Sequence, residues 1–491
     1  KWALSEQSYN EVIKYAAPEN KVFGYAHYKL AYVAWNKGDF QKGISEFKKT
    51  IDFGQQYSSL PNAKELANSA RRDLIPVYAL AGEPKKAHDF FKPLSGDAGG
   101  QTDKTFKMMD DLGQNYLDTG HYQQGIDLYT DLMTRDRGPK YCIYQAHIAE
   151  ATLAMKSGNK DQIIGELNKQ LDTYVKFEKE SQPEDAKLKC ANTTAELLSE
   201  TAMAWHLEAV GSGGVRGTGD KKTMSLAATL YEKVIGNFKP EQFAKFEFPR
   251  IVKDDWPSIS KIKYAMADLL YFNKDWAKCG PAFDAVVADD PNGTQAPEAA
   301  YASVLCYQNI YTETHKGDAA RKGTVHLPGG EDKKKGAKGA PVSKAKELAA
   351  KDFTDNQKGM LTAFNRYVCY IKPPANDKEA QEQYVEVKYA RARTYFEAQH
   401  WEEAALGFRD VALNHSDKDA AIYAAQLYLE SLNIMGGSLE PAHPSCYDDM
   451  AADVPKFIDS FCQKGKEKDA EQCGTLIRIQ RDIERLRAEK L

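Results

Sequence analysis

A pattern of two short helices joined by a glycine recurs along this 491-residue chain, and it limits the folds that the chain can adopt. The clearest example is L-G-Q-N-Y-L-D-T-G-H-Y-Q-Q-G-I-D-L-Y, residues 112–129, in which Gly120 and His121 make the turn. The small and large residues that define the two helices are Leu112, Gly113, Tyr116, Tyr122, Gly125, Tyr129 and Leu132. Small residues let two helices touch, and large ones fill the groove between them. The stretch therefore predicts one hairpin of a helical repeat of about 34 residues.

Copies of this hairpin pattern lie on both sides of it. Upstream, residues 29–51 and 73–94 place small and aromatic residues at the same offsets, and downstream residues 264–291 and 388–411 do so again. Weaker or interrupted copies fill the gaps, which gives about eight to ten hairpins. Stacked hairpins in this number predict an α-solenoid, in which each unit buries its apolar face against its neighbours. Long alternations of apolar and polar residues are almost absent, so the expected fold class is all-α.

Differences among the copies divide the chain into four parts. These are clear hairpins in 1–138, irregular hairpins with a glycine-rich loop at 211–223 in 139–297, hairpins with a lysine- and glycine-rich loop at 316–345 in 298–435, and capping helices in 436–491. Both loops interrupt a hairpin between its first and second helices, so we expect elongated loops rather than domain boundaries. The glycine-rich loop lacks the G-x-x-x-x-G-K-[ST] order of a phosphate-binding loop, which favours a flexible connection.

Composition and motifs argue against several classes of function. With 66 basic and 70 acidic residues and a net charge of -4, the chain gives no electrostatic reason to expect nucleic acid as a partner. No apolar run approaches the roughly 20 residues of a membrane-spanning helix, so we expect no transmembrane segment in the given chain. The metal motifs H-x-x-x-H and H-E-x-x-H and the nucleophile motif G-x-S-x-G are missing. We therefore expect no catalytic residue, no metal and no cofactor, and a protein that is not an enzyme.

Eight cysteines are present, and none forms a C-x-x-C pair. Cys462 and Cys473 flank a polar connection between two helical patterns, where a disulfide would close a helical hairpin. Buried free thiols are the alternative for any one pair. The other disulfide candidates, whose pairing the sequence leaves open, are Cys142, Cys190, Cys279 and Cys306. The even count and the start at Lys1 without a methionine favour an oxidising compartment and a removed signal peptide or lipid-anchored cysteine.

On these residues the chain resembles the tetratricopeptide-repeat family over most of its length, most clearly in 24–135 and 380–415. The family implies a scaffold for protein partners without catalysis of its own. The irregular repeats, the interrupted hairpins, the cysteines and the chain start also resemble periplasmic envelope proteins of myxobacteria, including those associated with gliding-motility machinery. This second resemblance implies a periplasmic or outer-membrane location, partners from an envelope complex, and a peripheral or lipid-anchored membrane association. A cytoplasmic location is the alternative.

The first resemblance assigns partner binding to the first helix of each repeat, at particular positions. In the first clear repeat these positions hold Tyr25, Tyr28, Tyr32, Trp35 and Asn36. Their spacing puts the four aromatic side chains on one helix face, where they would clamp an extended segment or a helix of a partner. The alternative is that these rings pack on neighbouring helices of the same chain.

Equivalent positions in other repeats give a mixed, partly aromatic lining. They are Lys107, Asp110, Gln114, Leu117 and Asp118; Lys261, Tyr264, Asp268, Tyr271 and Phe272; and Glu386, Tyr389, Arg393, Phe396 and Glu397. The lining lacks the Lys, Asn and Arg set by which some family members hold a C-terminal carboxylate, so we do not expect binding of chaperone tails. The sequence favours a non-catalytic scaffold for other proteins. The alternatives are a carbohydrate-binding solenoid, whose aromatic side chains stack on sugar rings, and a regulatory subunit of an envelope enzyme complex.

Overall fold

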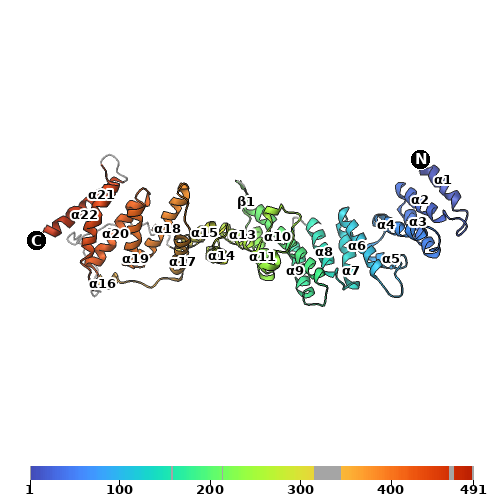
Figure 1. The fold of residues 1–491 in the computed structure, drawn as a ribbon, viewed down its shortest axis with the longest axis horizontal. Coiled ribbons are helices and arrows are strands. Elements are labelled where there is room, and N and C mark those ends of the chain that lie inside the picture. The colour runs from blue at the N-terminus through green and yellow to red at the C-terminus, as the bar shows by residue number, and fades with distance from the viewer. Residues whose placement is uncertain (1, 156–158, 213, 315–343, 464–468, 489–491) are drawn as a thin grey trace. The chain divides into compact units, whose positions relative to one another are not determined.

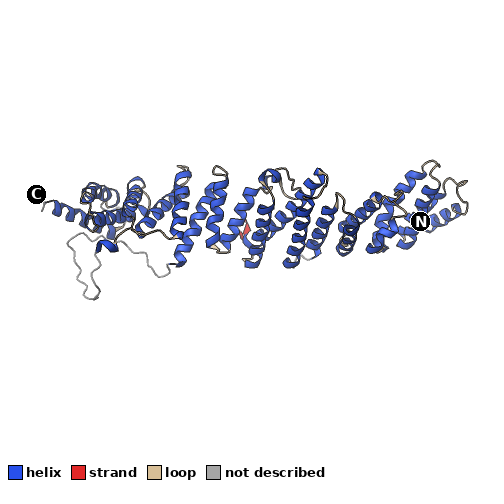
Figure 2. Ribbon diagram, turned by 90° about the horizontal axis from the view of Figure 1, so that it is seen from below, coloured by secondary structure: helices blue, strands red, loops and turns tan. Residues whose placement is uncertain are grey.

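The computed structural model describes residues 2–155, 159–212, 214–314, 344–463 and 469–488. Figures 1 and 2 show that these residues are almost entirely helical, as the sequence predicted. The first elements are α1 (Trp2–Val12), α2 (Phe23–Asn36), α3 (Phe40–Gln56), α4 (Ala63–Ala81), the 3-10 helix η1 (Pro84–Lys86), α5 (Ala87–Phe91), α6 (Asp103–Asp118), α7 (Tyr122–Arg135), α8 (Tyr141–Met155), α9 (Lys160–Phe177) and α10 (Glu184–Val210). The all-α solenoid of helical hairpins is therefore confirmed for the described chain.

The elements after α10 continue the hairpins with some additions. They are β1 (Gly211–Ser212), β2 (Val215–Arg216), α11 (Lys221–Asn237), α12 (Pro240–Phe243), the 3-10 helix η2 (Lys253–Asp255), α13 (Ile259–Phe272), α14 (Trp276–Asp289), α15 (Ala296–Thr314), α16 (Lys344–Glu347), α17 (Asp355–Tyr370), α18 (Lys378–Glu397), α19 (Trp401–Asn414), α20 (Ala420–Gly437), α21 (Cys446–Phe461) and α22 (Ala470–Ala488). Among the residues described, no helix is both long and apolar enough to span a bilayer.

Contacts within the chain define two compact units. Unit 1 contains Lys1–Ala209 and Glu232–Pro257, and unit 2 contains Val210–Tyr231 and Ser258–Leu491. Each unit has its own buried core of apolar side chains between successive helices. The four parts expected from the character of the repeats are a different kind of division, and they stay a prediction.

The hairpin of residues 112–129 shows how sequence produces the local fold. Leu112, Tyr116 and Tyr129 are fully buried between α6 and α7. A Cβ atom added to Gly113 would lie 2.4 Å from Cζ of Tyr129, which is far inside van der Waals contact. A glycine at this position therefore lets the two helices approach closely enough for the tyrosine ring to fill the groove between them.

Four turns between first and second helices share one backbone geometry. The turn residues Gly38, Gly120, Lys274 and Gln399 have left-handed φ angles of 79°, 77°, 61° and 64°. After each of them, the next backbone N–H donates to the carbonyl five residues earlier, at 2.8 to 2.9 Å; the pairs are Asp39 to Ala34, His121 to Tyr116, Asp275 to Leu270, and His400 to Tyr395. This is the Schellman arrangement that ends many helices. Because it recurs in both units, it fixes which positions of the repeats are equivalent.

The glycine-rich loop at 211–223, of which residue 213 lies outside the described residues, contains two short strands that the sequence did not predict. Its strands β1 and β2 pair antiparallel, with Gly211 opposite Arg216. Gly211 and Gly214 have φ angles of 91° and 81°, which glycine adopts without the steric cost that other residues have. These two glycines allow the tight reversal between the strands.

The second helix of this hairpin starts inside the range that was expected to be irregular. α11 begins at Lys221 because the Asp220 carboxylate accepts hydrogen bonds from the backbone N–H and the hydroxyl of Thr223, at 2.9 and 2.6 Å. Such a carboxylate satisfies N–H groups that the first turn of a helix leaves unpaired. Of the other predicted loop, 316–345, residues 316–343 lie outside the described residues, and α16 begins at Lys344.

Candidate partner-binding surfaces

The predicted binding positions on α2 form a continuous row on one side of this helix. We name the following residues the α2 row: Tyr25, Tyr28, Tyr32, Trp35 and Asn36. The Tyr25 side chain is 47% exposed, and Asn36 is exposed as well. Tyr28, Tyr32 and Trp35 are half-buried and pack against the core of unit 1. The row therefore has exposed ends and a centre that is anchored in the protein.

The two central tyrosines of the α2 row are fixed by Asp73 of α4, the first helix of the next repeat. The hydroxyls of Tyr28 and Tyr32 donate to Oδ2 of Asp73 at 2.5 and 2.8 Å. Both rings also meet the Phe47 ring edge to face, with centroids 5.8 and 5.6 Å apart. Burial, together with the hydrogen bond to Asp73, raises the pKa of Tyr28 well above its ordinary value. The alternative from the sequence, packing on neighbouring helices, thus holds for part of the row.

The equivalent position of the α6 repeat also contacts a neighbouring repeat. Oδ2 of Asp110 accepts from the Lys140 ammonium at 2.7 Å, just before α8 begins. Within the hairpin, the Tyr129 hydroxyl lies 3.2 Å from Oδ1 of Asp110. In both α2 and α6, the residue ten positions before the left-handed turn therefore contacts the next repeat and helps the repeats to stack.

The α13 positions combine packed and exposed side chains. Tyr264 meets the Phe283 ring edge to face at 5.6 Å, and its burial, with the nearby Glu298 carboxylate, raises its pKa. Tyr271 packs against Trp276 at 5.2 Å, whereas Phe272 is 48% exposed. The two polar members of this set, Lys261 and Asp268, are exposed and half-buried respectively. Phe272 is thus the aromatic ring that this helix offers to solvent.

The α18 positions are more enclosed. Tyr389 and Phe396 pack on the buried Phe408 ring at centroid distances of 5.5 and 6.0 Å. Nε of Arg393 donates to Glu397 one turn further along the same helix, at 2.9 Å. Aromatic side chains at these positions therefore support the core of unit 2 more than its surface.

One segment of unit 1, which the sequence did not single out, is irregular apart from the short helices α12 and η2, and it lies on the first helix α10. We name residues 238–257 the strap. The side-chain amide nitrogen of Asn192 donates to the Glu247 carbonyl at 2.9 Å, and the amide oxygen of Asn192 accepts from the Glu247 N–H at 2.8 Å. The strap is anchored by four phenylalanines that are each at most 3% exposed: Phe238, Phe243, Phe246 and Phe248. Their clustering in F-K-P-E-Q-F-A-K-F-E-F, without helical spacing, is the signal that could have indicated a docked segment.

The strap also inserts a guanidinium among three carboxylates. Nη2 of Arg250 lies 2.6 Å from Glu150 of α8, and Arg250 is 3.5 Å from Glu200 and 3.9 Å from Glu196 of α10. Burial raises the pKa of Glu196 and Glu200, although Arg250 acts in the opposite direction. For Glu150, by contrast, His147 and Arg250 outweigh burial and lower the pKa. The strap therefore bridges two first helices through one arginine.

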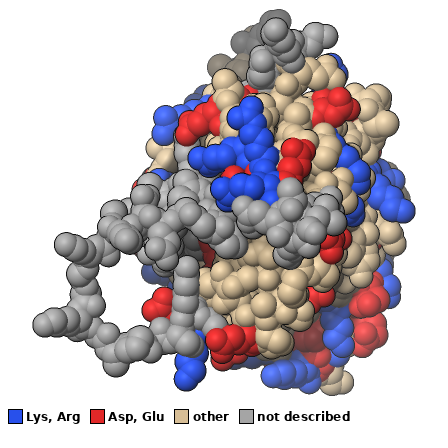
Figure 3. Space-filling view, turned by 90° about the vertical axis from the view of Figure 1, so that its left-hand side faces the viewer, with Lys and Arg blue, Asp and Glu red and all other residues tan. Residues whose placement is uncertain are grey.

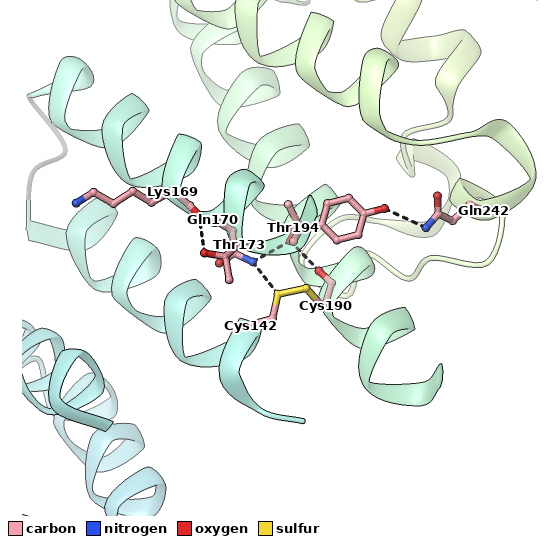
Figure 4. The surroundings of a disulfide bond; sticks show 8 residues. Cys142, Lys169, Gln170, Thr173, Cys190, Thr194 and Gln242 are labelled. Atoms are coloured by element: carbon pink, nitrogen blue, oxygen red, sulfur yellow. Dashed lines mark hydrogen bonds between the residues drawn. A yellow bond between two sulfur atoms is a disulfide. The ribbon is translucent and has the colours of Figure 1, made fainter. Parts of the chain in front are cut away.

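A disulfide joins the same two helices. Figure 4 shows Cys142 of α8 bonded to Cys190 of α10, with Cα atoms 5.7 Å apart. Nε2 of Gln170 donates to the Thr194 hydroxyl at 2.8 Å and lies 3.4 Å from Sγ of Cys142. Both sulfurs belong to fully buried residues. The helices that hold Arg250 are thus covalently fixed to each other.

The structure brings the six candidate cysteines together in three pairs. Besides Cys142–Cys190, it joins Cys279 of α14 to Cys306 of α15, and Cys462 to Cys473 of α22. The first two bonds each link a hairpin to the next first helix along the chain, whereas the third joins Cys462, directly after α21, to Cys473 of the consecutive helix α22. The free cysteines are Cys369, which is exposed, and Cys446, which is buried.

Metal ligands do not mark another site in the described part of the chain, and charge of both signs lies on one end of unit 2. Within it, no group of three or more His, Cys, Asp or Glu side chains is arranged to hold a metal ion. Figure 3 looks onto the end of unit 2 at which α22 lies, where acidic side chains surround one group of Lys and Arg side chains. A mixed face of this kind differs from the continuous basic stripe typical of nucleic-acid-binding proteins.

Comparisons with known proteins give only distant likenesses. No protein family and no curated protein matches the sequence. Among solved structures, the human IFIT1 dimer with m7Gppp-AAAA has 14% sequence identity and a TM-score of 0.21, with 99% of this chain and 95% of that chain covered. A circular tandem repeat protein with novel repeat topology has 10% identity and a TM-score of 0.22, with 99% of both chains covered. Likenesses at these scores carry no information on ligands, so the function is argued from the surfaces above.

Proposed function

We propose that this protein is a non-catalytic scaffold that binds extended segments of other proteins on the first helices of its repeats. The main observation behind this proposal is the set of contacts by which α10 binds the strap. Asn192 pairs with the main chain of Glu247, and three carboxylates surround Arg250 three residues later. A first helix of this chain thus holds a non-helical part of the strap by hydrogen bonds to its main chain and by one charged anchor, and hydrogen bonds to the main chain contribute to the affinity of many bound peptides.

The α2 row is the surface on which a partner segment would bind in the same way. It offers exposed Tyr25 and Asn36 at its two ends, with rigid aromatic rings between them. Tyrosine and tryptophan dominate the energetics of many interfaces because they bury a large area at a low entropic cost. Phe272 on α13 is a second, smaller contact in unit 2.

The proposed setting is a bacterial cell-envelope complex, in the periplasm or at the outer membrane. Three disulfides support it, because such bonds persist in oxidising compartments and are rare in the cytosol. The envelope partners and a peripheral or lipid-anchored membrane association extend the resemblance to myxobacterial envelope proteins, and they remain part of the proposal.

Co-purification from cells of the source organism tests this function. The full chain and its Tyr25→Ala/Tyr32→Ala variant are compared, with Tyr370→Ala as the control because Tyr370 is 67% exposed on α17, outside every predicted row. We expect one or more envelope proteins to be retained by the native chain and by the control, and lost from the double variant. Retention on a polysaccharide column without any protein partner would instead support the carbohydrate-binding alternative and contradict the scaffold.

A further inference from the structure

A positive charge already lies over the faces of three tyrosine rings in the α2 row. Nζ of Lys29 is 5.1 Å from the ring centroid of Tyr25, 5.8 Å from that of Tyr28 and 5.9 Å from that of Tyr32. All three distances fall within about 6 Å, the range in which a cation is attracted by an aromatic face. Lys29 forms no ion pair with any described residue. The three aromatic faces are therefore the contacts that the structure gives for this ammonium.

Asp73 makes two of these rings better acceptors of a cation. The phenols of Tyr28 and Tyr32 both donate their hydrogen bonds to its carboxylate. A phenol that donates to an anion gains electron density in its ring, and the attraction between a cation and a ring face is electrostatic. The raised pKa values of both tyrosines mean that the hydroxyls keep their protons and these bonds at neutral pH.

Two of the three rings, Tyr28 and Tyr32, are also held in place before any ligand arrives. Tyr28 and Tyr32 meet edge to face with centroids 5.2 Å apart, and both pack on Phe47, which is fully buried. Tyr25, which is 47% exposed, leaves one side of the group open to solvent. Because two of its three rings are already fixed, the group binds a ligand with a reduced entropic cost of ordering its own side chains.

We propose that Tyr25, Tyr28 and Tyr32 form an ammonium-binding site, that Lys29 is its tethered stand-in, and that its ligand is a lysine side chain of the partner protein. This inference rests on the proposed function, because it names the chemistry that the α2 row recognises. The choice of lysine follows from the group that already lies over the rings, which is a lysine ammonium, and from the negative charge of Asp73 at the hydroxyl ends of Tyr28 and Tyr32. Recognition of alkylammonium groups is a use to which aromatic groups of this kind are suited.

A titration of the full chain with model compounds tests the site. The probe is Nα-acetyl-lysine N-methylamide, and its neutral match is the norleucine compound, which has the same chain without the ammonium. Removing the tethered competitor in Lys29→Ala is expected to tighten binding of the lysine probe about two- to fivefold, since a cation–π contact at an exposed site is of that strength. Lys48→Ala, which removes an exposed lysine of α3, is the control and leaves the affinity unchanged.

Two further variants report on the rings and on Asp73. Tyr25→Leu and Asp73→Asn, each combined with Lys29→Ala, are expected to weaken binding of the lysine probe while the helical circular dichroism signal stays that of the parent. Equal binding of the lysine and norleucine probes would overturn the site, and so would a Lys29→Ala variant that binds no more tightly than the native chain. Tighter binding of choline than of the lysine probe would overturn the assignment to lysine and point to a quaternary ammonium.

The outcome for the site is separable from that for the scaffold. If a partner protein co-purifies through the α2 row but retains its affinity after its lysines are acetylated, the ammonium site is wrong and the scaffold stands. If no partner depends on the α2 row while the lysine probe binds as expected, the proposed function is wrong and the ammonium site stands for another ligand.

Discussion

Asn192 of α10 holds both backbone hydrogen-bonding groups of Glu247, donating to its carbonyl at 2.9 Å and accepting from its N–H at 2.8 Å. An amide side chain that pairs with the N–H and the C=O of one residue needs nothing from that residue's side chain. The helix therefore holds the strap through its main chain, and selectivity enters at Arg250. Hydrogen bonds to the main chain tolerate different side chains in the bound segment, and one charged residue adds selectivity. This combination is the basis of the proposed scaffold function.

Replacing Asn192 by leucine tests whether these two hydrogen bonds hold the strap on α10. Asn192→Leu keeps the number and branching of the side-chain heavy atoms and removes both hydrogen bonds, so it is expected to cost about 1–2 kcal/mol of stability. Hydrogen exchange of the Glu247 amide should accelerate in the variant, because its acceptor is lost. Mass-spectrometric exchange of the strap peptides is the measurement.

The control for this variant is Asn414→Leu at the exposed end of α19, where the side chain bonds only to Asp410 of the same helix. It should leave exchange in the strap unchanged. Unaltered exchange at Glu247 in Asn192→Leu would show that the strap is held by its phenylalanines alone.

At the four left-handed turns, replacing a glycine and introducing a glycine should have opposite effects on stability. Lys274 and Gln399 occupy positions where Gly38 and Gly120 stand in other repeats. A side chain in this conformation costs about 1–2 kcal/mol, of which the flexibility of glycine in the unfolded chain offsets a part. We expect Gly38→Ala to lower the unfolding midpoint, and Lys274→Gly and Gln399→Gly to raise it by the equivalent of less than about 1 kcal/mol. Calorimetry of the single variants decides this, and a lower midpoint for both glycine variants would contradict the shared geometry.

Glu430 in α20 should contribute a loss of stability as pH rises from about 4.5 to about 7. Burial raises the pKa of this carboxyl to about 7, and its Oε2 atom has no hydrogen-bond partner. The folded chain thus binds the proton more tightly than the unfolded chain, whose pKa stays near 4.5, so stability is lost between about pH 4.5 and 7 as pH increases. Glu430→Gln should be more stable than the native chain at pH 8, by about 2–3 kcal/mol, and equally stable at pH 4.

The measurement for Glu430 is the difference in unfolding free energy between variant and native chain as a function of pH. A difference that stays constant from pH 4 to pH 8 would mean that Glu430 does not titrate in this range. Glu484→Gln on α22, at an exposed position, is the matched control and should give no pH-dependent difference.

The three disulfides predict how many cysteines react with an alkylating reagent. Alkylation of the denatured protein without a reductant should label two of its eight cysteines, Cys369 and Cys446, and reduction should bring the number to eight. Intact mass spectrometry reads the number directly. Eight labels in freshly extracted, unreduced protein would contradict both the disulfides and the oxidising compartment.

Much of the fold could be predicted because a helical hairpin is a local structure. The alternation of small and large residues around Gly113 and Tyr129 specifies the contact between α6 and α7 within a few turns of chain. The register at Lys274 and Gln399 was harder to see, because there the left-handed turn has no glycine to mark it. Spacing in the flanking helices carried the prediction instead.

The strap and the role of Asp73 could not be predicted, because each depends on contacts between distant parts of the sequence. Gln242 of the strap bonds to the Tyr174 hydroxyl across 68 positions, and Tyr28 reaches Asp73 across 45. The spacing of apolar residues along one helix carries no information on pairs so far apart in the sequence. The aromatic row on α2 was visible in the sequence, but its anchoring by Asp73 was not, and its role in partner binding stays a prediction.

Photo-crosslinking from the α2 row is the most direct test of the scaffold. The photoreactive residue p-benzoylphenylalanine replaces Tyr25 or Asn36, the two exposed ends of the row, and in a control chain it replaces the exposed Tyr370. We predict that irradiation in the source cells joins the same protein partner to positions 25 and 36, and not to position 370. Absence of an adduct from both row positions, or an equal adduct from position 370, would contradict the assignment of partner binding to the first helices.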